Sequence, residues 1–375
     1  MSAIENRVSE IIREYDAQGW HRTGTEVDTA SAHWLVGRAG QLGVEATMES
    51  LPLSRVEPGE SYVEVDGRRV DGIPLFDCSF TAAEGVSGKL GVGGDIGLFD
   101  LEPNRGDEAY QQARRSGDLA AIVAFTTGGP PGLGPSNAPN FTDPFGLPVL
   151  QVSDEERDWL RSRAEAGASA IMVATATRIP ARAFNVVAEI VGHEPELSPV
   201  VVMTPRSGWW ECAAERGGGI AGWLEIMRSL SEAKAQRTVK FIASTGHELG
   251  HIGLESYIDH NLDLPTGAAV WVHLGASIGA AVDWTPHLQT SDASLEEAAL
   301  RHLKDSRLTV VPTGQVRGGE AEEIHSRGGR YVSIVGGHAT FHQQADRWPD
   351  AVDVVAMAEY AAAMAGVVLE LAAAK

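Results

Sequence analysis

Cysteine is almost absent from this chain of 375 residues, which contains only Cys78 and Cys212. Two cysteines cannot build a disulfide framework or a site of several cysteine ligands, and their scarcity is typical of proteins in the reducing cytoplasm. No uninterrupted apolar run approaches the roughly 18 residues of a membrane span, and no apolar signal-peptide core stands near the N-terminus. We therefore expect a cytoplasmic protein without a membrane partner.

Basic residues are also scarce: 30 Lys and Arg stand against 51 Asp and Glu, which gives a formal net charge of −21. A surface of this sign repels nucleic-acid phosphates and anionic lipids, so no nucleic-acid partner is expected. Hydrophobic residues make up 43% of the chain, which is enough to build a core. The length allows two domains, or one domain with an insertion, and a homo-oligomer is left open.

Helix and strand patterns at both ends of the chain predict an α/β fold. Apolar residues at helical spacing predict helices over 4–19 and 29–42, followed by a strand over 44–53. Beyond residue 183, continuous apolar runs predict strands that are buried on both faces, with helices between them. The strands predicted there are 185–191, 200–203, 239–243, 268–274 and 331–335, and the helices are 220–230, 295–303 and 351–371.

The middle of the chain differs, because glycine and proline are dense and apolar runs are short. It predicts a small β-rich domain, residues 56–182, inserted into an α/β domain of residues 1–55 and 183–375. The inserted domain lacks clustered histidines and carboxylates, so we expect it to shape access to a site rather than carry the chemistry. Its predicted elements are strands over 62–65, 120–125, 147–152 and 170–175, a helix over 154–166 capped by Ser153, and an irregular loop over 126–148.

The stretch RTVKFIASTGHELGHIGLES combines a short buried strand with His247, Glu248 and His251. One interpretation is the H-E-x-x-H zinc helix, in which two histidines share a helix face and the glutamate activates water. Three glycines disfavour that helix, because each costs roughly 1 kcal/mol of helix stability. A second interpretation, which we favour, places the three residues on a loop after a strand, where α/β sheets bind ligands. The third is local pairing without a catalytic role.

Other ionisable and aromatic residues follow predicted strands, so they can converge on one edge of the sheet. Two arginines could meet a substrate carboxylate or an oxyanion, and Glu211 or His247 could move protons. Each residue also has a structural interpretation, such as an ion pair, tryptophan packing or, for His273, a core hydrogen bond. The residues at this edge are Arg206, Trp209, Trp210, Glu211, Glu215, Arg216, His273, His338, His342 and Asp346.

The order of these segments resembles that of the zinc aminopeptidases of peptidase family M28. Glu248 begins a Glu-Leu-Gly run like the family's Glu-Glu-Leu-Gly, and GGHATFHQQADRW carries His342 and Asp346 at the spacing of its late signature. The segments GLPVLQVS and ARAFNVVAEIVG resemble the protease-associated domain of such enzymes. The resemblance implies a three-layer mixed sheet flanked by helices, as in zinc exopeptidases, with a smaller β-rich inserted domain.

The resemblance also implies an altered metal site. Glu248 and His342 stand unchanged in ligand positions, but His247 replaces the general-base glutamate. Thr204 and Arg206 stand near the positions of the first histidine and its accompanying aspartate. The bridging aspartate position falls in the glycine turn after Glu215, and the later aspartate position falls on residue 275 or 276. This pattern implies one metal ion rather than two.

We therefore expect a metal-dependent hydrolase that cleaves an amide, peptide or related C–N bond of a small molecule or short peptide. One divalent metal is expected, zinc first, although His and carboxylate ligands also suit Mn, Fe or Ni. Two alternatives remain open: a non-catalytic relative used for binding, and a metal-dependent cyclase, lyase or deaminase. The expected residues are His247, Glu211 and Arg206 for catalysis, Glu248, His342, Glu215 and His251 for the metal, and Arg216, Trp209 and Trp210 for the substrate.

Overall fold

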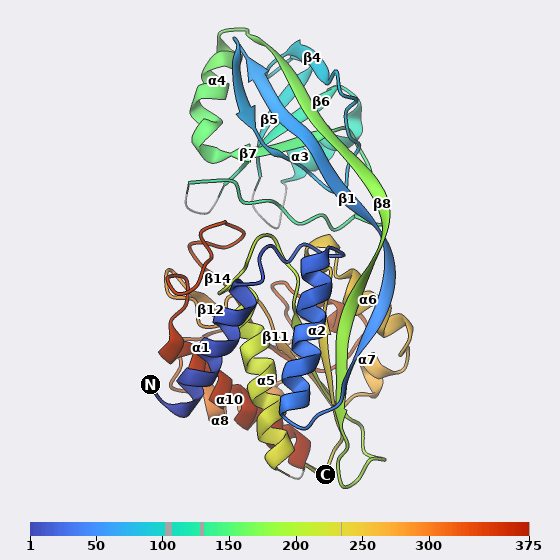
Figure 1. The fold of residues 1–375 in the computed structure, drawn as a ribbon, viewed down its shortest axis with the longest axis vertical. Coiled ribbons are helices and arrows are strands. Elements are labelled where there is room, and N and C mark those ends of the chain that lie inside the picture. The colour runs from blue at the N-terminus through green and yellow to red at the C-terminus, as the bar shows by residue number, and fades with distance from the viewer. Residues whose placement is uncertain (102–106, 128–130, 234, 375) are drawn as a thin grey trace.

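Figure 1 shows two lobes that share a pair of long strands in the computed structural model, which describes residues 1–101, 107–127, 131–233 and 235–374. Strands β1 (Ala46–Val65) and β8 (Ser169–Ile190) pair antiparallel along most of their length and run from the lower lobe into the upper one. The lower lobe is a large mixed sheet with helices on both faces. This arrangement confirms the predicted α/β fold class.

The large sheet has the strand order β13-β12-β14-β11-β9-β10-β8-β1-β2, and β4 pairs with β8. Neighbours β10, β9, β11 and β14 are parallel, so their carboxyl ends share one edge, and β12 is antiparallel to β14. The four parallel strands correspond to strands predicted from apolar runs, whereas β12 was not predicted. The bounds are β2 (Arg68–Asp71), β4 (Val86–Lys89), β9 (Val200–Pro205), β10 (Val239–Ser244), β11 (Val270–Leu274), β12 (Thr285–Thr290), β13 (Thr309–Val310) and β14 (Tyr331–Gly337).

Alternate side chains of the central strands fill two separate cores, one on each face of the sheet. Val200 and Val202 pack with helices α1, α2, α5, α8 and α10, whereas Val201 and Met203 pack with α6 and α9. Burial on both faces explains the continuous apolar runs of these strands. The helices are α1 (Ala3–Asp16), α2 (Glu26–Gln41), α5 (Gly217–Glu232), α6 (Ile252–Asp259), α7 (Leu264–Gly267), α8 (Ala293–Leu303), α9 (Ala321–Ser326) and α10 (Val354–Ala373).

Helix α10 is, among the described residues, the one helix long and apolar enough to cross a membrane. It packs against α1, α5 and α8, and half of its most apolar window is buried in the protein. Its composition is therefore explained by its place in the core, because a helix that is apolar on most sides is typical of a buried element.

The upper lobe contains a second sheet, of order β3-β7-β6-β5, which packs on the upper halves of β1 and β8. Strand β1 continues to Val65, so the predicted strand over 44–53 was too short. Pro52, Pro58 and Gly59 interrupt the sequence pattern of this strand. In the structure its pairing with β8 nevertheless continues past a register shift. The domain boundaries stay a prediction, and residues 128–130 of the predicted loop lie outside the described residues. The elements are β3 (Ile73–Pro74), β5 (Ile96–Leu101), α3 (Glu108–Ser116), β6 (Ala121–Thr126), β7 (Val149–Ser153), the 3₁₀ turn η1 (Asp154–Glu156) and α4 (Arg157–Glu165).

Candidate active site

The HELGH segment forms a loop directly after β10. It begins with one 3₁₀ turn, η2 (His247–Leu249), and α6 starts only at Ile252. Gly250 and His251 between them have φ angles of +82° and +57°, in the left-handed region, where a right-handed helix cannot continue. The interpretation as a long H-E-x-x-H zinc helix is therefore wrong, and the favoured placement on a loop at the end of a strand is confirmed.

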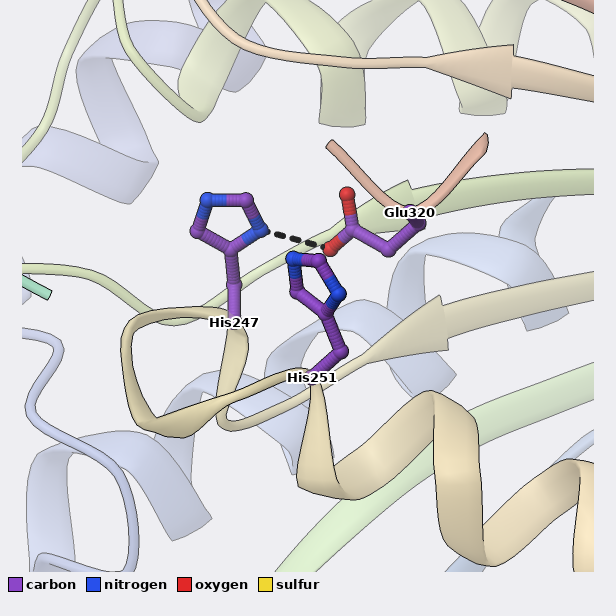
Figure 2. A group of neighbouring side chains, drawn as sticks. All are labelled: His247, His251 and Glu320. Carbon is purple, nitrogen blue, oxygen red and sulfur yellow. Dashed lines mark hydrogen bonds and ion pairs between the residues drawn. The ribbon is translucent and has the colours of Figure 1, made fainter. Parts of the chain in front are cut away.

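This loop brings both histidines beside Glu320, which immediately precedes α9 (Figure 2). The ring centroids of His247 and His251 lie 5.0 Å apart, and Nδ1 of His247 lies 2.8 Å from Oε1 of Glu320. One donor atom from each of the three residues lies within 4.8 Å of the others. Two imidazoles and one carboxylate thus converge, although they come from segments about seventy residues apart.

Further residues hold this cluster from outside. Nε2 of His273, on β11, lies 2.9 Å from the second oxygen of Glu320, and Nδ1 of His273 lies 2.8 Å from Oγ of Ser333. Nδ1 of His251 lies 3.1 Å from Oε1 of Glu323, whose other oxygen accepts a 2.8 Å bond from Arg327. These bonds orient His251 and Glu320, whereas His247 is oriented by Glu320 alone.

A cavity of about 800 Å³ opens onto the cluster. Its wall includes the two histidines and Glu320, and also Arg317 and His287. Asn137 and Pro139, from the irregular segment that precedes β7, line the other side. The volume lies in the range of roughly 300–1,000 Å³ that is usual for sites of small ligands. The cavity therefore offers a place where a small substrate can reach the cluster.

Burial and neighbouring charges set the ionisation of the cluster. Burial lowers the pKa of His247 to about 4, and the nearby Arg216 acts in the same direction. Burial alone would raise the pKa of Glu320, but the neighbouring histidines hold that pKa well below its usual range. Burial also favours neutral His251, but its bond to Glu323 outweighs this and raises its pKa. At neutral pH the cluster thus pairs a neutral His247 with an ionised Glu320.

Glu248, a predicted metal ligand, is buried, but its carboxylate is hydrogen-bonded outside the cluster of His247, His251 and Glu320. Its carboxylate accepts hydrogen bonds from Oγ1 of Thr23 at 2.5 Å and Oγ of Ser207 at 2.8 Å. Burial raises the pKa of this carboxyl. Although Glu248 is adjacent to His247 in sequence, it does not join the group formed by His247, His251 and Glu320.

Replacing Ser207 by alanine is expected to lower the free energy of unfolding by about 1–3 kcal/mol, the usual cost of leaving buried polar groups without partners. The hydroxyl donates to Glu248 and accepts a 2.7 Å bond from the backbone N–H of Gly246, so its loss affects both groups. Urea denaturation measures the change, and Ser116→Ala, at an exposed serine, is the control. Equal stabilities of the two variants would contradict a role for Ser207 in holding this carboxylate.

The predicted ligands Glu215 and His342 lie together, outside the group of His247, His251 and Glu320. Nε2 of His342 lies 3.4 Å from Oε1 of Glu215, and Nδ1 of His342 donates to the carbonyl of Pro135 at 2.7 Å. Among the described residues, neither Glu248 nor His251 completes a metal-type group with this pair. The four predicted ligands are therefore divided over separate places, which contradicts a single centre built from all four.

The side chain of Arg216 occupies the space beside Glu215. Its Nη2 lies 2.7 Å from Oε1 of Glu215, and its Nε donates to the carbonyl of Ser207 at 2.8 Å. Both side chains of this ion pair are fully buried and Arg216 is not part of the cavity wall, so its role in substrate binding stays a prediction that these contacts do not support. At that oxygen the guanidinium supplies the positive charge that a metal ion would bring, although Glu215 also forms a second group of possible metal ligands with Cys212 and Asp346.

The remaining predicted residues also have structural roles. Arg206 is fully buried, pairs with Asp28 at 2.9 Å and donates to the carbonyl of Phe184, so it does not reach the cavity. Glu211 lies 3.5 Å from Arg347 and is not among the residues of the cavity wall. These contacts do not support the predicted catalytic roles of Arg206 and Glu211, which stay predictions.

The two tryptophans pack rather than line the cavity. Trp209 is buried against Phe76, with ring centroids 5.1 Å apart, and its Nε1 donates to Asn137. Trp210 lies against Trp20 and donates to the carbonyl of His342. The predicted role of Trp209 and Trp210 in substrate binding is therefore not supported by their positions, which instead join the two lobes near the site.

Sequence reasoning did not find Glu320 or Glu323. They lie at the start of a helix of only six residues, too short for a visible hydrophobic period. One signal was present: Gly319, just before Glu320, has a φ of +78°, and a Cβ there would lie 2.8 Å from Cε1 of His273. Glycine at 319 therefore allows the close approach that brings Glu320 to His273.

Taken together, the large mixed sheet, the two helical layers and the position of the cavity define the M28-like fold of the zinc aminopeptidases. A zinc aminopeptidase from Bacillus subtilis shows it with a TM-score of 0.77 and 15% identity, over 98% of this chain and 94% of that one. An aminopeptidase from Aneurinibacillus sp. strain AM-1 has a TM-score of 0.75 and 16% identity, over 98% of this chain and 93% of that one. A peptidase M28 precursor from Shewanella amazonensis SB2B has a TM-score of 0.74 and 14% identity, over 99% of this chain and 96% of that one. The sequence itself matches no family model and no curated protein. At these identities the likeness shows the fold.

Proposed function

We propose that the protein is a metal-dependent hydrolase that cleaves an amide, peptide or related C–N bond in a small molecule or short peptide. The observation that carries the proposal is the cavity of about 800 Å³ at the carboxyl edge of the parallel strands, with His247, His251 and Glu320 in its wall. The likeness to zinc aminopeptidases supports zinc and this class of bond. The altered site argues for one metal ion.

The chemistry expected of a bound zinc ion is to polarise a carbonyl and lower the pKa of water. The chain's own residues would then bind and orient the substrate. Arg317 in the cavity wall suits a substrate carboxylate. His287 lines the same cavity, and burial lowers its pKa, so at neutral pH its imidazole is uncharged and able to accept a proton. Asn137 also lines the cavity, so its segment would help to set the size of the substrate.

The proposal predicts hydrolysis that depends on a divalent metal. Purified protein is incubated with aminoacyl amides, dipeptides and N-acyl amino acids, before and after chelation and with zinc added back. We expect turnover that chelation abolishes and zinc restores, because the fold and the donor residues both suit a metal-dependent reaction. Absence of turnover across these substrates with metal bound would favour the alternative of a non-catalytic binding protein.

Mass spectrometry of the products separates the remaining alternatives. The products of hydrolysis together exceed the mass of the substrate by one water, whereas those of a cyclase or lyase do not. A hydrolytic deaminase also takes up water and releases ammonia, so it is recognised only where the nitrogen that is lost was an amino group and not an amide. Arg317→Ala is expected to raise KM for substrates with a free carboxylate more than for their amides, since it removes the charge that would face that group. An equal effect on both substrate types would show that the substrate carboxylate does not bind at Arg317.

Cytoplasmic location belongs to the same proposal. Both cysteines are free and buried, and burial raises the pKa of Cys78 to about 12, which keeps its thiol protonated. Such thiols suit a reducing compartment and require no disulfide.

A further inference from the structure

We infer that His247, His251 and Glu320 are the ligands of a single divalent cation, with zinc the cation that fits best. The inference deepens the proposed function, on which it rests for the role of the ion, but it concerns binding and is tested by binding. The ligand set differs from the one expected from sequence, because Glu320 takes the place of Glu248 and neither Glu215 nor His342 takes part.

The donor set fits a catalytic type of zinc site, which has three protein ligands and one open position. Two imidazoles and a carboxylate are present, with donor atoms within 4.8 Å of one another. Ligands around a tetrahedral zinc ion lie about 3.3 Å apart, so the donors would need to move inward by only about an ångström. Both histidine side chains are partly exposed, at 10% and 16%, and they line the cavity, which leaves room for this movement and for an open position.

The residues behind the cluster support the same assignment. A metal-binding histidine usually gives its other ring N–H to a carboxylate, which fixes its orientation and tautomer. His251 has this arrangement: Nδ1 bonds Glu323, and among the described residues no hydrogen bond engages Nε2, so that nitrogen's lone pair is free for an ion. In His247 the nitrogen that faces the other two residues is Nδ1, which lies 2.8 Å from Oε1 of Glu320, so an ion would replace the proton between these two atoms.

Glu320 is also fixed from behind. Its Oε2 is bonded to His273, which is bonded to Ser333, and Nε2 of Gln289 donates to that serine at 3.2 Å. This chain of buried groups leaves Oε1 of Glu320 directed at His247, as Figure 2 shows. A carboxylate with one oxygen tied to the protein and the other facing two imidazoles is placed to be a monodentate ligand.

The charges nearby favour one cation and disfavour a second. Glu322 and Glu323 line the same cavity as Glu320, so the net charge at its wall attracts a divalent ion. The opposing charges include Arg317 in the same wall and Arg216, whose field reaches both His247 and Glu320. Because the guanidinium of Arg216 is already paired with Glu215, its positive charge occupies the position where a second metal ion could bind beside this carboxylate.

The test is zinc binding by variants. Metal-stripped protein is titrated with zinc chloride by calorimetry, and zinc is counted by plasma mass spectrometry after dialysis. We expect one equivalent in the wild type, loss of that equivalent in His247→Ala, His251→Ala and Glu320→Gln, and weakening by about 10–100-fold in Glu323→Gln, which removes only the outer partner of His251. His302→Ala is the matched control, because it removes another imidazole–carboxylate pair, with Glu370 at 2.9 Å, on the surface of α8. It should keep full zinc binding.

Several results would overturn the inference. One is an equivalent of zinc retained by His247→Ala and His251→Ala alike, and another is no zinc bound by a folded wild type. Circular dichroism and thermal unfolding confirm that each variant is folded. The outcomes also separate this inference from the proposed function. Zinc bound by these ligands without any hydrolysis would refute only the proposed function, whereas zinc-dependent hydrolysis by a protein whose ligand variants all retain zinc would refute only the cation site.

Discussion

Asp28→Ala is expected to lower the free energy of unfolding by about 3–5 kcal/mol, the usual cost of removing one partner of a buried ion pair. Asp28 on α2 and Arg206 after β9 are both fully buried, and their charged atoms lie 2.9 Å apart. The guanidinium also donates to the carbonyls of Asp28 and Phe184, so it cannot turn toward solvent when the carboxylate is removed. The variant would leave a buried positive charge without its partner.

The carboxylate of Asp28 has further bonds that the variant also removes. It accepts a 2.8 Å bond from the backbone N–H of Gly24, and Oγ1 of Thr245 lies 3.3 Å from both its oxygens. Urea unfolding with a full baseline measures the change in midpoint and slope. Asp71→Ala is the control: its partner Arg69 is 2.8 Å away, but both side chains are exposed, and its stability should stay close to that of the wild type. An equally small effect of Asp28→Ala would show that Arg206 is stabilised without its carboxylate.

Arg206 also shows where sequence reasoning ends. Its position after a buried strand predicted that it lies at the carboxyl edge of the sheet, and it does. Position alone did not show that its partner, Asp28, is 178 residues earlier in the chain and closes it off from the cavity. A charged residue near a site and a charged residue in a site share the same local sequence pattern; only the distant partner distinguishes them.

The loop that carries the cluster was more predictable, because its cause is local. Glycines around His247 and His251 disfavour a helix, and the structure has left-handed residues there. The third member of the cluster was not predictable in this way. Glu320 reaches the histidines through the tertiary fold, and no local period or cap in its short helix marks it. The alternation of apolar strands and helices predicted the fold, while contacts between distant segments determine the site.

Arg216→Met is expected to make the stability of the protein dependent on zinc. In metal-free buffer the variant should lose about 3–5 kcal/mol of the free energy of unfolding, because the buried charge of Glu215 loses its guanidinium partner. Burial alone would raise the pKa of Glu215, and Arg216, with His342, holds that pKa far below its usual range. Methionine fills part of the space of the arginine stem but supplies no charge.

Zinc is expected to restore part of that loss, since the groups around the missing guanidinium are metal ligands. Among the residues that the structure describes, no hydrogen bond engages Nε2 of His342, which lies 3.4 Å from Oε1 of Glu215, while Sγ of Cys212 lies 3.7 Å from the other oxygen of Glu215. A ligand that binds only the folded state stabilises it by about 2.7 kcal/mol at a concentration one hundred times its Kd. Unfolding of Arg216→Met in urea, with zinc and with chelator, measures this difference, and metal analysis should count a second equivalent.

Arg206→Met is the matched control, because it removes another fully buried arginine from a carboxylate. It should be destabilised to a similar degree but should not respond to zinc beyond the wild type, since Asp28 belongs to no group of metal-type ligands among the described residues. If zinc stabilised both variants equally, the effect would come from zinc bound at the cavity cluster and not from zinc bound in the space left by the Arg216 side chain. If it stabilised Arg216→Met alone, the guanidinium would be established as the side chain that excludes a metal ion from the position beside Glu215.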